Sequence, residues 1–348
     1  MRIYCDGIFD LFHKGHLEHF KKIHQYFKTP IHLIVGIISD EVAINYKRKP
    51  VFNEKKRLKI IESILYVNET FITDTLVLDE FFFDKYKIDY VVHAFNDPSD
   101  KNKQTTFFEY AIKANKFIEI DYNVGTSTTK IIESYYGTEM IKKHEKNLKW
   151  NEIWENKGIE DTSDLYTLNG WENTTFDPQK LINNIINSLY INKDEKILEI
   201  GCGAGLLSTF LKDYDYFGLD YSITLVSKHI QLLENVVINF SCTDIIFKDN
   251  YFDYVIINST LEYLNSNEEL NKTISEIERI TKKGIYIANI RHKTRTIKID
   301  KHKYEGEFSH FIINKDYFSK LGYKIIDSLY DEDRYDVFKQ INEELSEF

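Results

Sequence analysis

Cysteine is scarce in this sequence, and its spacing excludes two kinds of site. The three cysteines, Cys5, Cys202 and Cys242, lie far apart among 348 residues, and no C-x-x-C pair occurs. Neither a disulfide framework nor a cysteine-based zinc site is indicated, and we expect no dedicated metal site. No secretory leader follows Met1, so we expect reduced thiols and a cytoplasmic location.

Long apolar runs and an excess of basic charge are also missing. No run approaches the roughly 18 apolar residues of a membrane span, so we expect no membrane insertion. Acidic residues number 55 and basic residues 45, giving a formal net charge of −10, which argues against a nucleic-acid partner held through its phosphates. Because of this charge we expect small-molecule partners instead. The composition is globular, with 43% hydrophobic residues, and the length predicts two domains.

Short apolar runs alternate with amphipathic segments in two separate series. The predicted strands are 2–10, 31–39, 69–73, 88–95, 116–122, 196–203, 216–222, 237–244, 252–259 and 284–290, and the predicted helices begin near 16 and cover 53–64, 105–115, 126–136, 178–190, 206–213 and 267–280. Such alternation is typical of parallel sheets with right-handed crossovers. We expect the α/β class, with two Rossmann-like three-layer domains, each built on a mostly parallel sheet with helices on both faces.

The stretch "DGIFDLFHKGH" places a histidine pair at the first strand-to-helix turn. His13 and His16 flank Gly15, which permits a tight turn and close approach of a phosphate to the backbone. Imidazoles near their ordinary pKa of about 6.5 can donate hydrogen bonds to a phosphate. A pair of surface histidines is the competing interpretation, and metal binding is a weaker one because no third ligand is evident nearby.

The wider context of this turn carries a family resemblance. "DGIFDLFHKGH", "LIVGIISDE", "NYKRKPVFNEKKR", "YVNE", "IDYVVH" and "GTSTTKII" resemble, in order and spacing, the CTP-dependent cytidylyltransferases acting on choline phosphate, ethanolamine phosphate and glycerol phosphate. The resemblance covers residues 1–136 and implies a nucleotidyltransferase domain that releases pyrophosphate from CTP, with Mg²⁺ accompanying the nucleotide. It implies catalytic roles for His13, His16, Lys47 and Arg57, and nucleotide contacts for Gly7, Ile8, Phe9, His93, Gly125, Ser127, Thr128 and Thr129.

Several positions depart from the pattern of that family. Tyr122 stands where the family has an arginine, and Ala94-Phe95 follow His93 where the choline-phosphate enzymes read His-Asp-Asp. Protein sites bind a quaternary ammonium group through aromatic faces and a carboxylate. Either Phe95, Asp97 and nearby aromatics rebuild the choline cage, or the alcohol phosphate is different. The segment 66–69 resembles a dimer contact of the family, so we expect a homodimer formed through this domain.

A glycine-rich turn, "KILEIGCGAGLL", marks a second nucleotide-type site. Such a turn after a strand also occurs in nicotinamide-dinucleotide folds, but here the glycines do not continue as G-x-G-x-x-G. With acidic residues at the ends of the next two predicted strands, the series resembles class I S-adenosylmethionine-dependent methyltransferases over residues 170–348. The resemblance implies donor contacts from Glu199, Gly201, Gly203, Gly205, Asp220, Asp244 and Asn258.

Residues 137–169 lie between the two series and read as a linker or lid helices. Trp150 and Trp154 are helical neighbours that either pack as an apolar stripe or form, with Trp171, a lid over the donor. After "GIYIA", the residues Asn289, Arg291 and His292 are candidates for contact with the methyl acceptor, and His292 is a candidate general base for a hydroxyl acceptor.

These two halves suggest one pathway. The first hypothesis is a bifunctional enzyme that transfers a cytidylyl group to a small alcohol phosphate and methylates the same or a related molecule. A second sends the activated group to a surface glycan or phosphonate, with O-methylation as decoration. A third is a nucleotide-binding scaffold whose cytidylyltransferase half has lost turnover, motivated by Tyr122 and by Ala94-Phe95.

Overall fold

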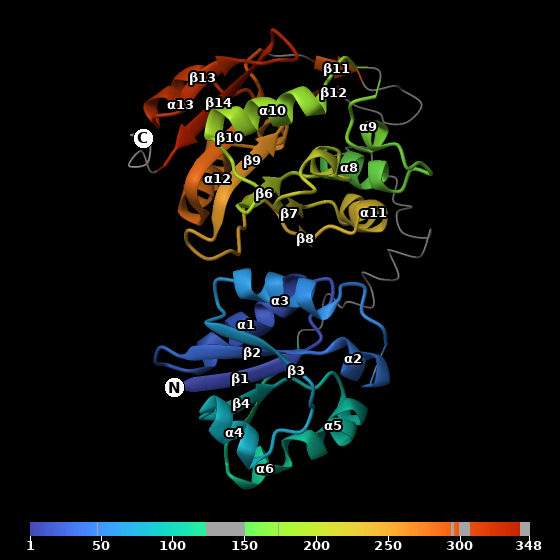
Figure 1. The fold of residues 1–348 in the computed structure, drawn as a ribbon, viewed down its shortest axis with the longest axis vertical. Coiled ribbons are helices and arrows are strands. Elements are labelled where there is room, and N and C mark those ends of the chain that lie inside the picture. Colours follow the sequence, from blue (N-terminus) through green and yellow to red (C-terminus); the bar gives the residue numbers. More distant parts are fainter. Residues whose placement is uncertain (47, 123–149, 173, 294–295, 299–306, 342–348) are drawn as a thin grey trace. The chain divides into compact units, whose positions relative to one another are not determined.

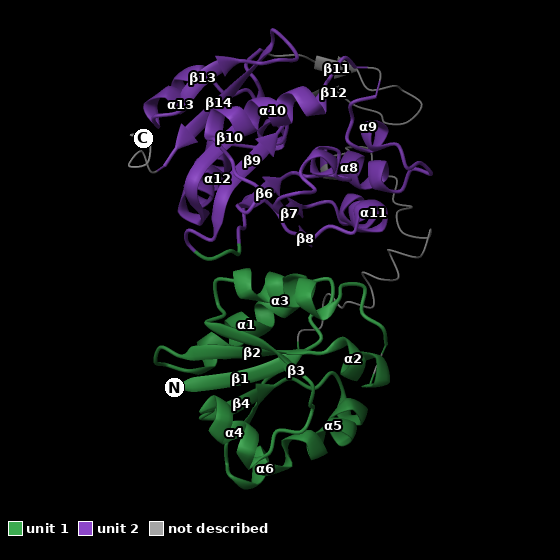
Figure 2. Ribbon diagram, in the orientation of Figure 1, with its two compact units in different colours: residues 1–132, 246–248 green, residues 133–245, 249–348 purple. Residues whose placement is uncertain are grey.

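The fold consists of two compact units (Figures 1 and 2). The computed structural model describes residues 1–46, 48–122, 150–172, 174–293, 296–298 and 307–341. Unit 1 comprises Met1–Ile132 with Ile246–Lys248, and unit 2 comprises Glu133–Ile245 with Asp249–Phe348. Within the described residues, no helix is long and apolar enough to cross a membrane.

Unit 1 is a five-stranded parallel sheet in the order β3-β2-β1-β4-β5. Its elements are β1 (Arg2–Gly7), α1 (Lys14–Tyr26), β2 (His32–Ile38), α2 (Asp40–Tyr46), α3 (Glu54–Ser63), β3 (Glu69–Thr73), α4 (Glu80–Tyr86), β4 (Tyr90–His93), α5 (Pro98–Gln104), η1 (Thr105–Phe108), α6 (Glu109–Lys113) and β5 (Phe117–Glu119). In Figure 1, α1 and α3 lie on one side of this sheet, and α4, α5 and α6 lie on the other.

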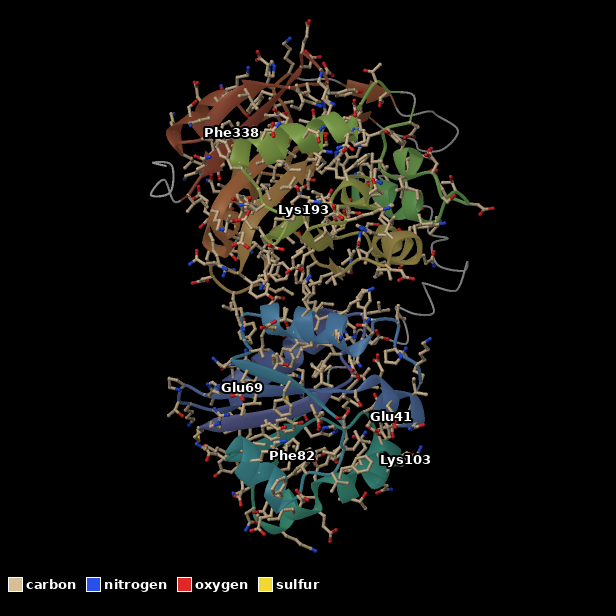
Figure 3. All side chains as sticks on the ribbon, in the orientation of Figure 1. Glu41, Glu69, Phe82, Lys103, Lys193 and Phe338 are labelled. Carbon is tan, nitrogen blue, oxygen red and sulfur yellow. The ribbon has the colours of Figure 1, made fainter. Side chains whose placement is uncertain are left out.

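The central position of β1 explains its apolar sequence. Tyr4 lies opposite Ile34 of β2 and Val91 of β4, so this strand is covered on both edges. Its ring packs in a buried cluster with Phe82 of α4, whose side chain is labelled in Figure 3. Parallel strands that carry helices on both faces read as nearly continuous apolar runs. The carboxyl end of β1 therefore opens directly onto the turn that carries the histidine pair.

Unit 2 contains a seven-stranded sheet in the order β13-β14-β10-β9-β6-β7-β8. Its elements are α8 (Trp150–Gly158), α9 (Leu165–Leu168), α10 (Pro178–Leu189), β6 (Lys196–Ile200), η2 (Leu207–Phe210), β7 (Asp215–Asp220), α11 (Ile223–Leu233), β8 (Val237–Asn239), β9 (Phe252–Asn258), η3 (Leu261–Tyr263), α12 (Asn267–Ile280), β10 (Thr281–Arg291), β11 (Thr296–Lys298), β12 (Glu307–Ser309), α13 (Lys315–Lys320), β13 (Lys324–Asp327) and β14 (Arg334–Gln340). Five of these strands run parallel, whereas β14 pairs antiparallel with β10 and with β13.

Helix α10 packs on this sheet and contributes to its core. Asp177 caps its first turn by accepting from Lys180 N, and Pro178 occupies the first helical position, where a missing N–H costs nothing. Leu181 and Ile185 lie in a buried cluster with Tyr286 of β10. Burial of such side chains contributes about 1.5–3 kcal/mol each and fixes the sheet that positions the second site.

The predicted α/β class with mostly parallel sheets is confirmed, one predicted helix was wrong, and several elements were missed, including α2, α4, α5, α11, α13 and β11 to β14. The helix expected over 206–213 is only the short 3₁₀ turn η2. Helix α11 was not predicted, because its β-branched start resembles a continuing strand. The antiparallel strands β13 and β14 were also missed. The helix expected over 126–136 falls outside the described residues.

Candidate functional site

The histidine pair of unit 1 lies at the start of α1, just after β1. His13 is the N-cap of that helix, and its Nδ1 accepts a hydrogen bond from Gly15 N at 3.0 Å. The rings of His13 and His16 stack with centroids 3.9 Å apart. The helix N-terminus adds partial positive charge at this position, so the corner suits an anion.

The backbone that leads into this corner is strained. Phe9 and Leu11 have φ values of 49° and 46°, in the left-handed region that few residues other than glycine adopt. The Phe9 ring lies edge-on to His16, with centroids 5.3 Å apart, and closes the turn. A Cβ at Gly7 would lie 3.0 Å from the Phe9 ring, so glycine keeps this packing open. Strained residues of this kind cluster at functional sites.

Burial changes the expected protonation of two histidines at this site. It lowers the pKa of His13 to about 4, so the sequence expectation of an ordinary pKa was wrong for this residue. Since Nδ1 of His13 accepts from Gly15, the neutral ring carries its proton on Nε2, so Nε2 is the donor atom of this side chain. Burial likewise lowers the pKa of His93 to about 4, and His93 Nε2 has no hydrogen-bond partner among the described residues.

Arg57 occupies a different environment from the one its proposed catalytic role suggested. Its side chain is fully buried. The guanidinium donates to the carbonyl oxygens of Ile8, Ile38 and Phe52 at 2.5, 2.8 and 3.0 Å, and it forms an ion pair with Asp40 at 2.7 Å. Four of its five donors are thus used within the protein. This geometry favours a residue that positions the loop at Ile8 over one that contacts substrate.

The sequence analysis missed a buried aspartate, Asp10, which lies in the loop before the histidine pair and binds the segment 48–52. Asp10 accepts from Val51 N and Phe52 N at 2.9 and 3.0 Å and forms an ion pair with Arg48 at 3.1 Å. Its only sequence signal is its place between Phe9 and the histidines. The candidate residues Lys47, Gly125, Ser127, Thr128 and Thr129 lie outside the described residues.

The second site is a cavity of about 240 Å³ in unit 2. It opens where the parallel strands β6, β7, β9 and β10 end, the usual position of ligands in open α/β sheets. The lining includes five of the predicted donor residues, namely Glu199, Gly201, Gly203, Asp220 and Asn258.

The glycine turn after β6 depends on close backbone packing. Gly201 has φ +73°, and a Cβ there would lie 2.0 Å from Thr260 Oγ1. Gly203 has φ +52°, and its Cβ would lie 2.2 Å from Asn169 Oδ1. Neither position accepts another residue without displacement of its neighbour. The turn is therefore built to bring backbone, rather than side chains, against a ligand.

Two buried carboxyl groups flank this turn. Asp220 accepts from Gly203 N at 2.8 Å and from Ser222 N at 2.9 Å, and burial raises its pKa to about 6. Glu199 accepts from Tyr216 Oη at 2.7 Å, and burial raises its pKa to about 8. Asp220 thus ties the glycine turn to the start of α11.

Two of the three tryptophans of the 150–171 segment contribute to the lining of the cavity. Trp154 and Trp171 line it, and Trp154 lies edge-on to Tyr263 with centroids 5.4 Å apart. Trp171 also stacks on Phe176 at 3.9 Å, while Trp150 stacks on His310 at 4.7 Å. The sequence analysis left a packing stripe and a lid as alternatives, and these contacts combine packing with cavity lining.

Three further candidates lie away from this cavity lining. Gly205 has φ +94° and packs on His229, so it contributes to the packing of the glycine turn. Asp244 is exposed. His292 contacts the carbonyl of Glu332 at 3.1 Å.

The acceptor candidates at the end of β10 divide between two roles. Asn289 is buried and donates to Asn258 Oδ1 at 2.7 Å, which orients a cavity residue. Arg291 lines the cavity directly, together with Glu262 and Arg334. The last two were missed, because Glu262 lies in a 3₁₀ turn and Arg334 on an unpredicted antiparallel strand.

Comparison with known proteins supports two different domain types. A cytidylyltransferase-like family model matches residues 4–134, and a methyltransferase-domain model matches residues 198–288. Choline-phosphate cytidylyltransferase 2 of Arabidopsis thaliana is 35% identical over 135 residues, which is 38% of this chain and 43% of the relative. Choline-phosphate cytidylyltransferase A of Homo sapiens is 33% identical over 132 residues, 38% of this chain and 35% of the relative.

Ethanolamine-phosphate cytidylyltransferase of Arabidopsis thaliana is 32% identical over 136 residues, 38% of this chain and 31% of the relative. The chain thus spans less than half the length of these three curated relatives. Among solved structures, a SAM-dependent methyltransferase of Methanosarcina mazei aligns with a TM-score of 0.39 and 16% identity, covering 45% of this chain and 96% of that one. The chain therefore combines a cytidylyltransferase-like domain at residues 4–134 with a methyltransferase domain that includes residues 198–288.

Proposed function

We propose that the protein is a bifunctional transferase that activates a small alcohol phosphate with CTP and methylates the same or a closely related molecule. The observation that carries the proposal is the pairing, on one chain, of the stacked His13–His16 corner with a separate cavity around the glycine turn of β6. We take choline- or ethanolamine-phosphate-like compounds as the substrate class, because relatives that match 135 and 136 residues of this chain carry those names.

In the first reaction, a phosphate oxygen of the alcohol phosphate attacks the α-phosphorus of CTP. A new P–O bond forms, the bond to the β-phosphate breaks, and pyrophosphate leaves with the bonding electron pair. We assign the Nε2–H of neutral His13, His16 and the N-terminus of α1 to stabilising the charge that develops on the phosphates. Lys47 and the segment 125–129 would complete the nucleotide site. Mg²⁺ would arrive with CTP, since no described group of three or more His, Cys, Asp or Glu side chains is placed to hold it.

In the second reaction, S-adenosylmethionine supplies a methyl group from its sulfonium. The acceptor lone pair forms the new bond to carbon as the C–S bond breaks, its electrons return to sulfur, and an amine acceptor then loses a proton to water. We assign donor binding to Glu199, the turn at Gly201 and Gly203, and Asp220. An amine is the favoured acceptor, because Trp154 and Tyr263 line the cavity and aromatic faces attract cations.

The alternative functions, the oligomeric state and the location of the protein also stay proposals. O-methylation of a surface-glycan or phosphonate substituent is a second candidate, and a scaffold with an inactive first site is a third. Homodimerisation through residues 66–69 and a cytoplasmic location are predictions that light scattering and fractionation would check.

The full chain should be incubated with CTP, Mg²⁺ and a panel of phosphomonoesters while pyrophosphate release is followed. We expect release with at least one amino-alcohol phosphate. If CTP binds but no member of the panel causes pyrophosphate release, the cytidylyltransferase proposal is wrong and the scaffold hypothesis replaces it. Label transfer from S-adenosylmethionine to amine and hydroxyl compounds would then identify the acceptor class.

A further inference from the structure

Two buried arginines lie side by side where the cavity of unit 2 meets its antiparallel strand. Arg291 ends β10 and Arg334 begins β14, and the two residues face each other in the strand register. Their side chains are only 5% and 7% exposed, and both line the cavity. Burial of two guanidinium groups requires compensating anions.

The described partners supply one carboxylate for these two cations. Glu262 Oε2 accepts a hydrogen bond from Arg291 Nε at 2.9 Å, and Glu262 Oε1 accepts one from Arg334 Nη1 at 3.2 Å. Arg334 Nη1 also donates to two neutral acceptors, Asn289 O at 2.6 Å and Ser259 Oγ at 3.2 Å. The group of three therefore carries one net positive charge.

A second acidic residue of the lining, Asp331, forms no ion pair with either arginine in the described part of the chain. The Asp331 carboxylate accepts from Asp333 N at 2.9 Å, within its own turn. The other lining carboxyl groups, Glu199 and Asp220, end strands β6 and β7, which β9 separates from β10 in the sheet. Asp336 does not line the cavity but shares the charge of this cluster, since burial raises the pKa of Asp336 to about 6 and Arg334 opposes that shift. The case for a ligand anion therefore depends on the hydrogen-bonding state of the two guanidinium groups.

Donor groups for such a ligand are already in place. Within the part of the chain that the structure describes, Arg291 Nη1 and Arg334 Nε are buried and make no hydrogen bond. A buried donor without a partner costs about 1–3 kcal/mol, so such atoms call for an explanation. Guanidinium groups match the oxygens of a phosphate, which accepts several N–H donors at once.

We infer that Arg291 and Arg334 form a phosphate subsite that holds the methyl acceptor by its phosphate group. The inference rests on the proposed methyltransferase function and deepens it, because it makes the phosphate a requirement of the second reaction. The acceptor would lie between this subsite and Asn258, with its amine near Trp154 and Tyr263. The phosphate belongs either to an alcohol phosphate or to a CDP-linked alcohol.

Intrinsic fluorescence isolates this cavity from the CTP site. All three tryptophans lie between residues 150 and 171, and two of them line the cavity. Inorganic phosphate should be titrated into the full chain, with and without saturating S-adenosylhomocysteine, while tryptophan emission is recorded. We expect a saturable change whose midpoint rises at least about tenfold in Arg291→Gln and in Arg334→Gln, because a charged hydrogen bond is lost.

Two further variants separate binding from folding. Glu262→Gln keeps the shape of the cluster but removes the competing carboxylate, so phosphate should bind more tightly than to the wild type. Arg279→Gln is the matched control, since Arg279 of α12 pairs with Asp249 and with Glu276 and does not line the cavity. Absence of a saturable change, or arginine variants that behave like Arg279→Gln, would overturn the subsite. Loss of S-adenosylhomocysteine binding in the arginine variants, with phosphate binding intact, would assign the arginines to the donor instead.

Label transfer then identifies the source of the phosphate. Ethanolamine phosphate, CDP-ethanolamine and ethanolamine should be compared as acceptors from methyl-labelled S-adenosylmethionine. We expect transfer to a phosphate-bearing compound and not to ethanolamine, and equal transfer to ethanolamine would contradict the inference. Failure of S-adenosylhomocysteine to bind would defeat the methyltransferase proposal, while the phosphate titration would still test the subsite by itself.

Discussion

At the scale of single residues, His16 provides the sharpest test of the first site. Replacement by alanine removes a ring that stacks on His13 at 3.9 Å and leaves the helix cap on His13 intact. We expect CTP turnover to fall by at least about a hundredfold, the scale of losing a group that stabilises transition-state charge. Pyrophosphate release measures the effect. His32→Ala is the control, because His32 pairs with Glu69 at the start of β2, and turnover equal in the two variants would refute the role of His16.

Glu199 gives the protein a measurable pH dependence. Its folded pKa of about 8 exceeds the usual carboxyl value of 4.5, and burial is the cause. The neutral form is favoured in the folded state, so this stabilising contribution is complete below pH about 4.5 and is lost as the pH rises through about 8. Glu199→Gln removes the contribution, and the variant should gain at least about 1 kcal/mol relative to the wild type between pH 5 and pH 8.

Denaturant unfolding at the two pH values measures that difference. Lys193, labelled in Figure 3, forms an exposed ion pair with Asp213, and Asp213→Asn serves as the carboxylate control. Parallel changes in Glu199→Gln and in the control would show that burial of Glu199 does not set the pH dependence.

Arg57 shows what residue patterns cannot reveal. Its motif predicted a catalytic arginine, yet the structure surrounds it with three carbonyl oxygens and Asp40. Whether a guanidinium faces substrate or backbone depends on contacts with segments far away in sequence, and periodicity carries no information on those contacts. His13 and His16 were predictable because a single local turn brings them together.

At the scale of elements, several hydrogen bonds join helix α8 to the start of α11, and most of them involve Glu155. Glu155 accepts from Ile223 N and Thr224 N at 3.0 and 3.1 Å and thereby caps α11 together with Ser222. Glu155→Ala removes these acceptors and should lower the free energy of unfolding by about 1–3 kcal/mol. Because Trp154 adjoins Glu155, donor affinity should weaken as well.

Glu152→Ala is the matched control for that variant, since Glu152 lies exposed on the same helix. Its effect on unfolding should stay within about 0.5 kcal/mol. Thermal unfolding and a titration with S-adenosylhomocysteine report both quantities. Equal effects of the two substitutions would show that the cap on α11 contributes little.

Strand and helix boundaries were predictable where the pattern was local. The strand expected over 69–73 and the helix expected over 267–280 coincide with β3 and α12. Helix α11 escaped because apolar, β-branched residues dominate its first turns, although Ser222 was a usable cap signal. Strand β14 pairs with β10, and the edge strand β13 pairs with β14, so both depend on long-range contacts that no local pattern encodes.

At the scale of the whole molecule, the two reactions should be separable by mutation. Asp220→Ala removes the acceptor of the Gly203 and Ser222 N–H groups, so S-adenosylmethionine should bind at least about tenfold more weakly. CTP turnover should stay unchanged, because unit 1 contains none of these contacts. Isothermal titration and pyrophosphate release check the two halves, and joint loss would mean that the units depend on each other.

The fold class of both sheets was predictable from the sequence, since strands alternate with helices along each half of the chain. The part of the second cavity to which we assign the methyl donor was also predictable, because a glycine turn and strand-end acids are local signals. The part to which we assign the acceptor was not, since Glu262, Arg291 and Arg334 meet only through the sheet order.

Product analysis of one incubation tests the central claim most directly. The full chain should receive CTP, Mg²⁺, methyl-labelled S-adenosylmethionine and the alcohol-phosphate panel together, and the products should be separated by chromatography. The account predicts label in a methylated compound linked to cytidine diphosphate. Label and cytidine that never occur in one product, with any member of the panel, would contradict a single bifunctional enzyme.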